Sequence, residues 1–206
     1  MRKVTYGAAC SLDGFIAGPD KELDWLHYSK DVSEVMATYF ESIDTILFGR
    51  KTWVHAQAMM AGGDAPPEDA FKGVQSYVFS RTLETLADPR VRLVREDAAD
   101  FVRGLKKRPG RGICVMGGGE LARSLFEADL IDEVGLNIHP ILLGGGIPMF
   151  PAPGPRVTLK FLGSRVLSGG CVLVNFRVQH RRSRKSVRSV SNAERAELAG
   201  NVSQPT

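Results

Sequence analysis

The stretch ICVMGGGELARSLF, residues 113–126, constrains the fold more than any other part of the chain. A short apolar run typical of a buried strand meets three consecutive glycines, and the apolar residues after them recur at helical spacing. A glycine inside a regular element costs roughly 0.5–1 kcal/mol relative to alanine. Three in succession therefore indicate either a tight strand-to-helix turn or a turn at which another group approaches the backbone closely.

The same alternation of apolar runs and helical stretches extends along most of the chain. Strands are predicted at residues 3–10, 45–49, 76–80, 91–95, 112–116 and 131–142. Helices are predicted at residues 29–42, 50–59, 97–107 and 119–130, and a surface loop at 62–73. Two further strands, 157–167 and 170–179, flank a Ser-Gly-Gly turn that is typical of a hairpin. The pattern predicts an α/β fold with a central mixed sheet and an antiparallel C-terminal edge.

Apolar spacing also predicts which helix faces are buried. The first helix is expected to bury Val32, Val35, Met36, Tyr39 and Phe40. The helix after the triple glycine is expected to bury Leu121, Leu125 and Phe126.

Charge divides the chain into a body and a tail. Of 27 basic and 23 acidic residues, residues 180–206 hold six and two, so residues 1–179 carry 21 of each sign. The neutral body argues against nucleic-acid binding by the domain. We expect residues 1–179 to form one domain. The Arg- and Ser-rich tail, residues 180–206, is expected to be disordered because it has few large apolar side chains to bury.

The cysteines and the N-terminus indicate the cellular compartment. Cys10, Cys114 and Cys171 lie far apart in apolar runs and show no metal-ligand spacing, so they are predicted to be buried free thiols and no metal is expected. The N-terminal segment is too short and polar for a signal peptide, and no apolar run approaches the roughly 20 residues of a membrane span. We therefore expect a cytoplasmic protein without a membrane partner.

Three predicted strands end in turns suited to anions. These turns lie in ILFGRKTW (46–53), VFSRTL (78–83) and VMGGGELA (115–122). In open α/β sheets ligands bind outside the carboxyl ends of the strands, and helix N-termini there favour phosphates. Three such turns are compatible with a dinucleotide, including one that bears an extra phosphate.

These segments occur in order with SLDGFIAG (11–18) and HPILLGGGIPMF (139–150). Together they resemble the dihydrofolate reductase superfamily, and most closely the C-terminal reductase domain of the bacterial bifunctional riboflavin-biosynthesis deaminase-reductase, over residues 2–179. The resemblance implies a dihydrofolate reductase-like three-layer fold. Its central, mostly parallel mixed sheet would have eight strands and an antiparallel C-terminal hairpin, with helices on both faces. It implies NADPH as cofactor and hydride transfer to a substrate such as 5-amino-6-(5-phosphoribosylamino)uracil. The H-x-E…P-C-x-x-C zinc signature of the fused deaminase is absent from this sequence.

Carried over to the matching positions, the resemblance implies four groups of cofactor-binding residues. The loop over the nicotinamide would comprise Ala8, Asp13, Gly14, Phe15, Ile16 and Ala17. The cofactor phosphates would be held by Gly49, Arg50, Lys51 and Thr52. The adenosine ribose and its 2′-phosphate would lie beside Ser80, Arg81 and Thr82. The pyrophosphate and nicotinamide ribose would be lined by Gly117, Gly118, Gly119, Glu120 and Leu121.

The sequence constrains the proton donor and the substrate contacts less. Dihydrofolate reductases carry an acid early in the first helix, and the candidates here are Asp24 and Asp31, with water as a further proton source. Asp31 also fits an ordinary acid of a helix first turn. Trp25 has two interpretations, stacking on a flat substrate or simple packing of its loop. His139, beside Pro140, is interpreted as a core or edge histidine.

Several functional interpretations remain open from the sequence. The first is an NADPH-dependent reductase acting on a small heterocyclic or sugar-phosphate substrate. The alternatives are a dihydrofolate reductase and a nucleotide-binding protein without catalysis. A tail that binds RNA or an acidic surface is a further hypothesis, and a homodimer is plausible because members of the resembled family often pair.

Overall fold

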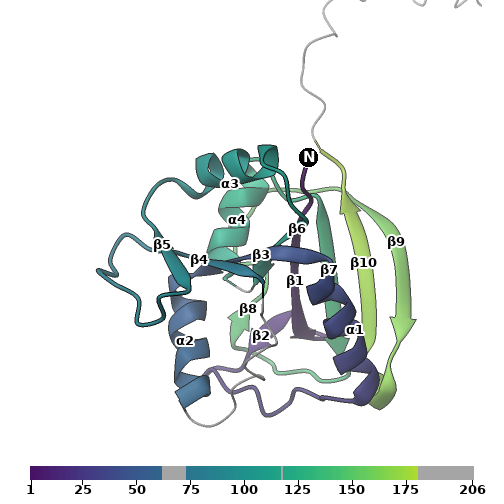
Figure 1. Cartoon of the computed structure of the whole chain (residues 1–206). Coiled ribbons are helices and arrows are strands. Elements are labelled where there is room, and N and C mark those ends of the chain that lie inside the picture. Colours follow the sequence, from purple (N-terminus) through teal and green to yellow (C-terminus); the bar gives the residue numbers. More distant parts are fainter. Residues whose placement is uncertain (62–72, 117, 181–206) are drawn as a thin grey trace, which may run out of the picture.

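The computed structural model describes residues 1–61, 73–116 and 118–180. Its centre is an eight-stranded sheet (Figure 1). In spatial order the strands are β5 (Val91–Val94), β4 (Gln75–Phe79), β3 (Ile43–Gly49), β6 (Gly112–Met116), β1 (Val4–Ser11), β7 (Glu133–His139), β10 (Val172–Val178) and β9 (Leu159–Val166). Strand β10 runs antiparallel to both neighbours, and all other pairs are parallel. The predicted sheet and its antiparallel C-terminal hairpin are confirmed.

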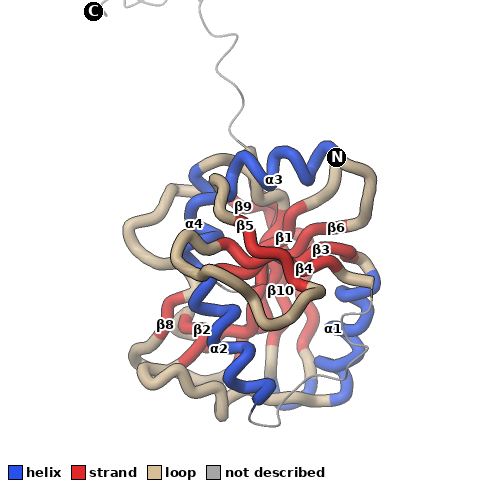
Figure 2. Tube along the Cα trace, turned by 60° about the vertical axis from the view of Figure 1, so that its left-hand side comes forward, coloured by secondary structure: helices blue, strands red, loops and turns tan. Residues whose placement is uncertain are grey.

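Helices on both faces of the sheet make three layers, as Figures 1 and 2 show. The helices of the described residues are α1 (Lys30–Glu41), α2 (Arg50–Ala61), α3 (Ala98–Lys107) and α4 (Gly119–Glu127). On one face, Trp53 of α2 and Phe40 of α1 belong to the same apolar cluster as Ile46 of β3. On the other, Leu105 of α3 and Leu125 of α4 pack in the main core. The sheet thus separates two apolar layers.

Helix α1 shows how local sequence and tertiary packing combine. Ser29 caps the helix, since its hydroxyl oxygen accepts a hydrogen bond from the N–H of Val32 at 3.4 Å. Val32, Val35 and Tyr39 pack inward as predicted. The prediction for Met36 is wrong: its side chain is 41% exposed. Helical spacing therefore predicted a buried stripe one residue too wide, since Met36 joins neither of the apolar clusters that contain its neighbours on α1.

Other differences lie in short or terminal segments. Strands β2 (Phe15–Ala17) and β8 (Ile147–Pro148) pair antiparallel in a separate small sheet, where the sequence predicted only loops. Helix α4 ends earlier than expected, and Asp129 beyond it takes a left-handed conformation with φ of 59°. Residues 62–72 of the predicted loop and the tail from residue 181 lie outside the described residues. Within the described part, no helix is both long and apolar enough to span a membrane.

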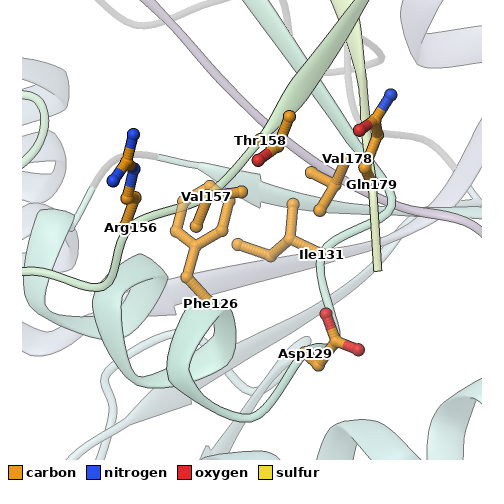
Figure 3. Close-up of a pocket in the computed structure, with 8 residues that line it drawn as sticks. All are labelled: Phe126, Asp129, Ile131, Arg156, Val157, Thr158, Val178 and Gln179. Atoms are coloured by element: carbon orange, nitrogen blue, oxygen red, sulfur yellow. The ribbon is translucent and has the colours of Figure 1, made fainter. Parts of the chain in front are cut away.

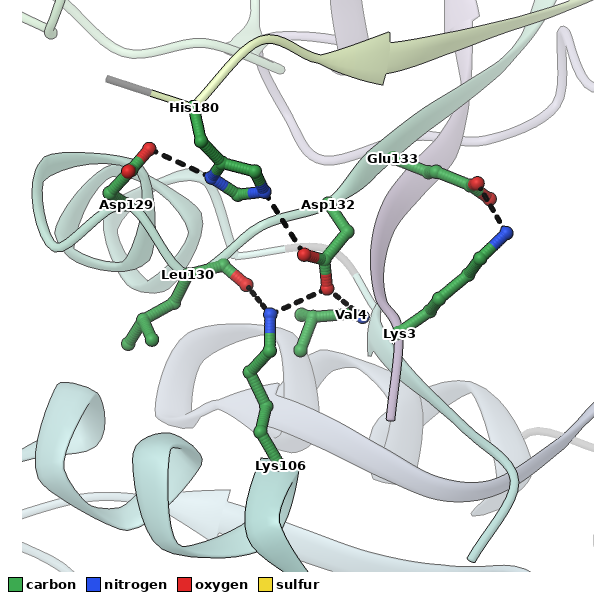
Figure 4. A network of polar contacts seen from close by, with 8 residues as sticks. All are labelled: Lys3, Val4, Lys106, Asp129, Leu130, Asp132, Glu133 and His180. Atoms are coloured by element: carbon green, nitrogen blue, oxygen red, sulfur yellow. Dashed lines mark hydrogen bonds and ion pairs between the residues drawn. The ribbon is translucent and has the colours of Figure 1, made fainter. Parts of the chain in front are cut away.

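A polar network joins the elements near the N-terminal end of β7 (Figure 4). The side chain of Lys106, on α3, is 6% exposed, and its Nζ donates to Asp132 Oδ2 at 2.6 Å and to the carbonyl oxygen of Leu130 at 3.0 Å. The same Asp132 oxygen accepts from the N–H of Val4 at 2.8 Å. His180 Nε2 lies 3.1 Å from the other carboxylate oxygen. The network ties α3 to β1, to β7 and to the segment after β10.

Candidate active site

The segments predicted to bind the cofactor follow strands that end at one edge of the sheet. Strands β1, β3, β4, β6 and β7 are parallel, so their carboxyl ends meet at that edge. The small β2–β8 sheet lies at the same edge (Figure 1). Because ligands of open α/β sheets bind outside the carboxyl ends of the strands, the fold brings the predicted residues to the expected side.

The chain leaves β3 and β6 in opposite directions although these strands are neighbours. From β3 it passes through α2 to β4, and from β6 it passes through α4 to β7 on the other side. Such a switch point opens a crevice between two strand ends. Helices α2 and α4 begin there, so their free N–H groups and partial positive charges lie together.

Close contacts within the protein account for two of the glycines after β6. Gly118 has φ of 72°, and a Cβ there would lie 3.4 Å from both Gly49 N and Thr52 Oγ1. A Cβ on Gly119 would lie 2.6 Å from Pro151 Cδ. The sequence led us to expect that side chains at these positions would intrude on a dinucleotide. At Gly118 and Gly119 the close neighbours are protein atoms, and Gly117 lies outside the described residues.

Helix α4 offers its backbone rather than its side chains to a ligand. The N–H of Ala122 bonds the carbonyl oxygen of Gly118 at 3.0 Å, so the N–H groups of Gly119, Glu120 and Leu121 have no partner within the helix. The Leu121 side chain is 8% exposed and lies in the core. The Glu120 carboxylate accepts from Arg123 Nη2 at 2.9 Å. Any contact of Glu120 or Leu121 with a phosphate would therefore use the N–H groups.

Two cations lie at the start of α2 without a counter-ion among the described residues. Arg50 and Lys51 are exposed, and neither forms a hydrogen bond or ion pair with another described residue. Cations are unfavourable at a helix N-terminus, where the dipole already places positive charge. An anion bound at this point would remove that repulsion. Thr52, half-buried, adds a hydroxyl in the same turn.

The turn after β4 is built around Ser80. This serine is 8% exposed, and its Oγ accepts from the N–H groups of Thr82 at 3.2 Å and Leu83 at 3.0 Å. Its hydroxyl oxygen therefore shapes the turn. Arg81 and Thr82 are exposed, and Arg81 has no partner among the described residues. Within the described residues, Arg81 is therefore the charged side chain of this turn that is available to a ligand.

The loop predicted to cover the nicotinamide is fastened to the loop after β7. Asp13 accepts from the N–H groups of Leu143 at 3.2 Å and Gly144 at 2.8 Å. Hydrogen bonds from Ser11 and from these two amides lower the pKa of Asp13. Strand β2 adds its pairing with β8. Ala17 is buried, and the remaining predicted residues of this group are half-buried: Ala8, Gly14, Phe15 and Ile16.

Asp31 is held by the turn between β9 and β10. Its Oδ2 accepts from the N–H of Ser168 at 2.7 Å and from the Ser168 hydroxyl at 3.1 Å, while its Oδ1 contacts the Ser29 hydroxyl. These bonds, that from Ser29 foremost, lower the pKa of Asp31 to about 2. An acid held in its ionised form is a poor proton donor near neutral pH. Its bonds are those of a structural carboxylate, and its catalytic role stays a prediction.

Trp25, the predicted substrate contact, belongs to a cluster around His139. The Trp25 ring meets the His139 ring edge-on with centroids 5.3 Å apart, and the N–H of His27 donates to His139 Nδ1 at 3.3 Å. His139 is 2% exposed, and burial lowers its pKa, so the ring is neutral. The interpretation of His139 as a core histidine is confirmed. Asp24 is exposed in the same loop.

The structure adds a residue that the sequence reasoning missed. Asn137 Nδ2 lies 3.2 Å from His139 Nε2, and its buried Oδ1 has no partner among the described residues. Its signal was an amide in the middle of the apolar strand VGLNIH. Because Nδ1 of the neutral His139 ring accepts from His27, its Nε2 carries the proton, and turning the Asn137 amide over places its oxygen against that N–H, so this amide pairs with His139 beside the predicted Trp25.

A pocket on the α4 side lies apart from these residues (Figure 3). It is enclosed by the end of α4, the segment before β9 and the end of β10, and is lined by Phe126, Asp129, Ile131, Arg156, Val157, Thr158, Val178 and Gln179. None of the predicted site residues lines it. The predicted cofactor residues instead lie along the open edge of the sheet.

Comparisons with known proteins bear on the family and the fold of the chain. A family model of the RibD C-terminal domain matches residues 2–173. "Uncharacterized protein YyaP" of Bacillus subtilis is 35% identical over 179 residues, which cover 84% of this chain and 94% of that protein.

Solved structures share the fold. A "Putative riboflavin biosynthesis protein" from Shewanella sp. PV-4 has a TM-score of 0.73 and 26% identity, covering 86% of this chain and 99% of that chain. A diaminohydroxyphosphoribosylaminopyrimidine deaminase/5-amino-6-(5-phosphoribosylamino)uracil reductase from Thermotoga maritima has a TM-score of 0.62 and 17% identity, covering 86% of this chain and 57% of that chain. The expected dihydrofolate reductase-like α/β fold is confirmed.

Proposed function

Because the chain belongs to the RibD C-terminal domain family, we propose that it is an NADPH-dependent reductase of the riboflavin-pathway type. It would transfer hydride to a C=N or C=O bond of a heterocyclic or sugar-phosphate substrate resembling 5-amino-6-(5-phosphoribosylamino)uracil. The observation that carries the proposal is the meeting of two helix N-termini at the β3–β6 switch point, beside Arg50 and Lys51, which have no counter-ion in the part of the chain that the structure describes. Together they make a site for a polyanion.

The residues of the chain fit a phosphorylated dinucleotide. Arg50 and Lys51 would neutralise its phosphates, and the free N–H groups at the start of α4 would donate to the pyrophosphate. Gly118 keeps the space between the two helix starts free of a side chain. Arg81, one strand further out, would meet the phosphate on the adenosine ribose.

When bound, NADPH would supply the hydride. The protein would orient the reactants and exclude water. The Asp13 bonds and the β2–β8 pairing hold the covering loop in place, so little ordering remains to be done on binding. The neutral His139 ring supports Trp25, which would stack on the substrate ring. Among the predicted proton sources, the exposed Asp24 or water is favoured over the hydrogen-bonded Asp31.

A titration with NADPH and NADH tests the cofactor proposal. Nicotinamide fluorescence should report micromolar binding of NADPH and much weaker binding of NADH. Loss of one charge-assisted hydrogen bond, about 1.5–3 kcal/mol, predicts that Arg50→Ala weakens NADPH roughly 10- to 150-fold. Arg103→Ala, on α3, removes an equal charge elsewhere and should leave binding unchanged. Failure of the unmodified protein to bind either dinucleotide refutes the proposal.

A substrate screen then separates the alternatives. Turnover of dihydrofolate that antifolates block would make the protein a dihydrofolate reductase. NADPH binding without oxidation by any reducible substrate would make it a nucleotide-binding protein. NADPH oxidation with a pyrimidine ribosyl phosphate supports the reductase proposed here.

We also propose a homodimer formed along β9. This edge strand has eight residues and exposes Phe161 at 57% and Val166 at 74%. An apolar edge of this length is prone to pair with another strand, and a two-fold axis would let two copies of β9 pair with each other. Light scattering after gel filtration should give twice the chain mass, and Phe161→Lys should give monomers. A monomeric unmodified protein at micromolar concentration contradicts this proposal.

The cysteines support a cytoplasmic location. Cys10, Cys114 and Cys171 are buried, and all three are free thiols. Disulfides are rare in the reducing cytoplasm and common in secreted domains. Free thiols throughout the domain are what a cytoplasmic reductase would carry.

A further inference from the structure

Arg95, which directly follows the edge strand β5, holds the turn that carries Arg81. Its Nη2 donates to the carbonyl oxygens of Leu83 and Glu84, both at 2.8 Å. That nitrogen carries two hydrogens, and each has an acceptor. The Arg95 guanidinium therefore fixes two successive peptide units of the turn. No motif in the sequence singled this arginine out.

Ser80 holds the same turn from inside. Its Oγ accepts the N–H groups of Thr82 and Leu83, at 3.2 Å and 3.0 Å. Because both amides are engaged, a phosphate beside this turn cannot use them. Recognition is left to exposed side chains, and Arg81 is the cation without a partner among the described residues.

The pairing of β4 with β5 brings the turn of Arg81 and the residue Arg95 to the same end of the sheet. Phe79 of β4 pairs with Val94 of β5, and the N–H of Ser80 donates to the carbonyl oxygen of Val94 at 3.1 Å. Arg95 is the first residue beyond this last pair on its strand, and Arg81 is the second beyond it on the other. Arg81 belongs to the turn, and Arg95 reaches across to that turn from the neighbouring strand end.

We propose that Arg95 is a positioning residue that holds the turn 80–84 so that Arg81 meets the 2′-phosphate of the cofactor. Arg95 is thereby a determinant of the preference for NADPH over NADH. This inference rests on the proposed function. Without the guanidinium, the carbonyl oxygens of Leu83 and Glu84 lose their hydrogen bonds from Arg95. Cofactor binding must then order the turn, and this entropic cost weakens the affinity. A lysine keeps the charge but lacks the planar fork of donors that arginine holds in fixed geometry.

The test compares ligands with and without the 2′-phosphate on the full-length protein. Calorimetry measures binding of adenosine 2′,5′-bisphosphate, AMP, NADPH and NADH to the unmodified protein and to Arg95→Ala, Arg95→Lys and Arg92→Ala. We expect Arg95→Ala to weaken the bisphosphate and NADPH at least tenfold and to change AMP and NADH less than twofold. Arg95→Lys should lose nearly as much. Arg92→Ala, an exposed charge on the same strand, should bind like the unmodified protein.

Each contrary outcome has one meaning. If Arg95→Ala binds the bisphosphate like the unmodified protein, or loses AMP equally, the positioning role is wrong while NADPH binding by the unmodified protein upholds the proposed function. If Arg95→Lys keeps full affinity, charge alone suffices and the positioning role is again wrong. If the unmodified protein binds neither dinucleotide, the proposed function fails and this inference fails with it.

Discussion

Replacing Gly119 by alanine tests whether the glycines after β6 serve the packing of the protein itself. The added Cβ would lie 2.6 Å from Pro151 Cδ and 3.0 Å from the carbonyl oxygen of Met149. Neither neighbour moves easily, because the proline ring is rigid and the Met149 oxygen accepts from the Tyr6 hydroxyl at 2.6 Å. Overpacking of this kind costs about 1–3 kcal/mol. For a chain of this length, that should lower Tm by about 2–12 °C.

The assay is thermal unfolding followed by circular dichroism, without any cofactor. Gly145→Ala is the matched control, because a Cβ there meets nothing within 4 Å, and its stability should change by less than about 0.5 kcal/mol. Gly118→Ala, at φ of 72°, should lose about 1–2 kcal/mol from backbone strain alone. If Gly119→Ala melts like the unmodified protein yet loses NADPH binding, the ligand and not Pro151 requires this glycine, and the reasoning is refuted.

Three further predictions concern titratable side chains. Hydrogen bonds from Ser29 and Ser168 lower the pKa of Asp31 from 3.8 to about 2, so its stabilising effect is present above about pH 4 and disappears as the pH falls through about 2. Asp31→Asn should therefore lower Tm at pH 7 but not near pH 2, and an unchanged pH profile of turnover would exclude Asp31 as the donor. Asp132→Asn leaves Lys106 buried without its counter-ion and should lose about 3–5 kcal/mol in urea unfolding; a loss below about 1 kcal/mol would contradict this. Burial and the nearby His27 lower the pKa of His139 from 6.5, so the unfolded chain binds more protons and stability should fall as the pH drops through about 6.5, a slope that His139→Gln should flatten.

Sequence reasoning found the elements that carry their own periodic signal. The apolar pattern predicts strand β6 over five residues and helix α4 over nine residues. Strands β2 and β8, of three and two residues, have no period to detect and pair only because the fold brings residues 15–17 beside 147–148. Met36 shows a different limit: helical spacing predicts which side of α1 faces the protein, but not how far the other elements cover that side.

Individual side chains at the candidate site show the limit more sharply. For Leu121 the resemblance implied a place beside the cofactor, while its spacing correctly predicted a buried side chain. The sequence pattern identified Asp31 as an acid of a first helical turn, but only the approach of Ser168, 137 residues along the chain, shows that this carboxylate is bound. Arg95 gave no signal at all, because its partners are backbone carbonyls of another loop.

The sequence by itself determined the alternation of strands and helices, the shared edge at which the strands end, and the glycines and cations that follow those ends. These properties depend on spacing within a few residues, where backbone geometry and capping act. The tertiary structure alone decided that Pro151 approaches Gly119 and that Arg95 holds the turn of Arg81. Those contacts join residues distant in sequence, and their geometry depends on the path of the whole chain.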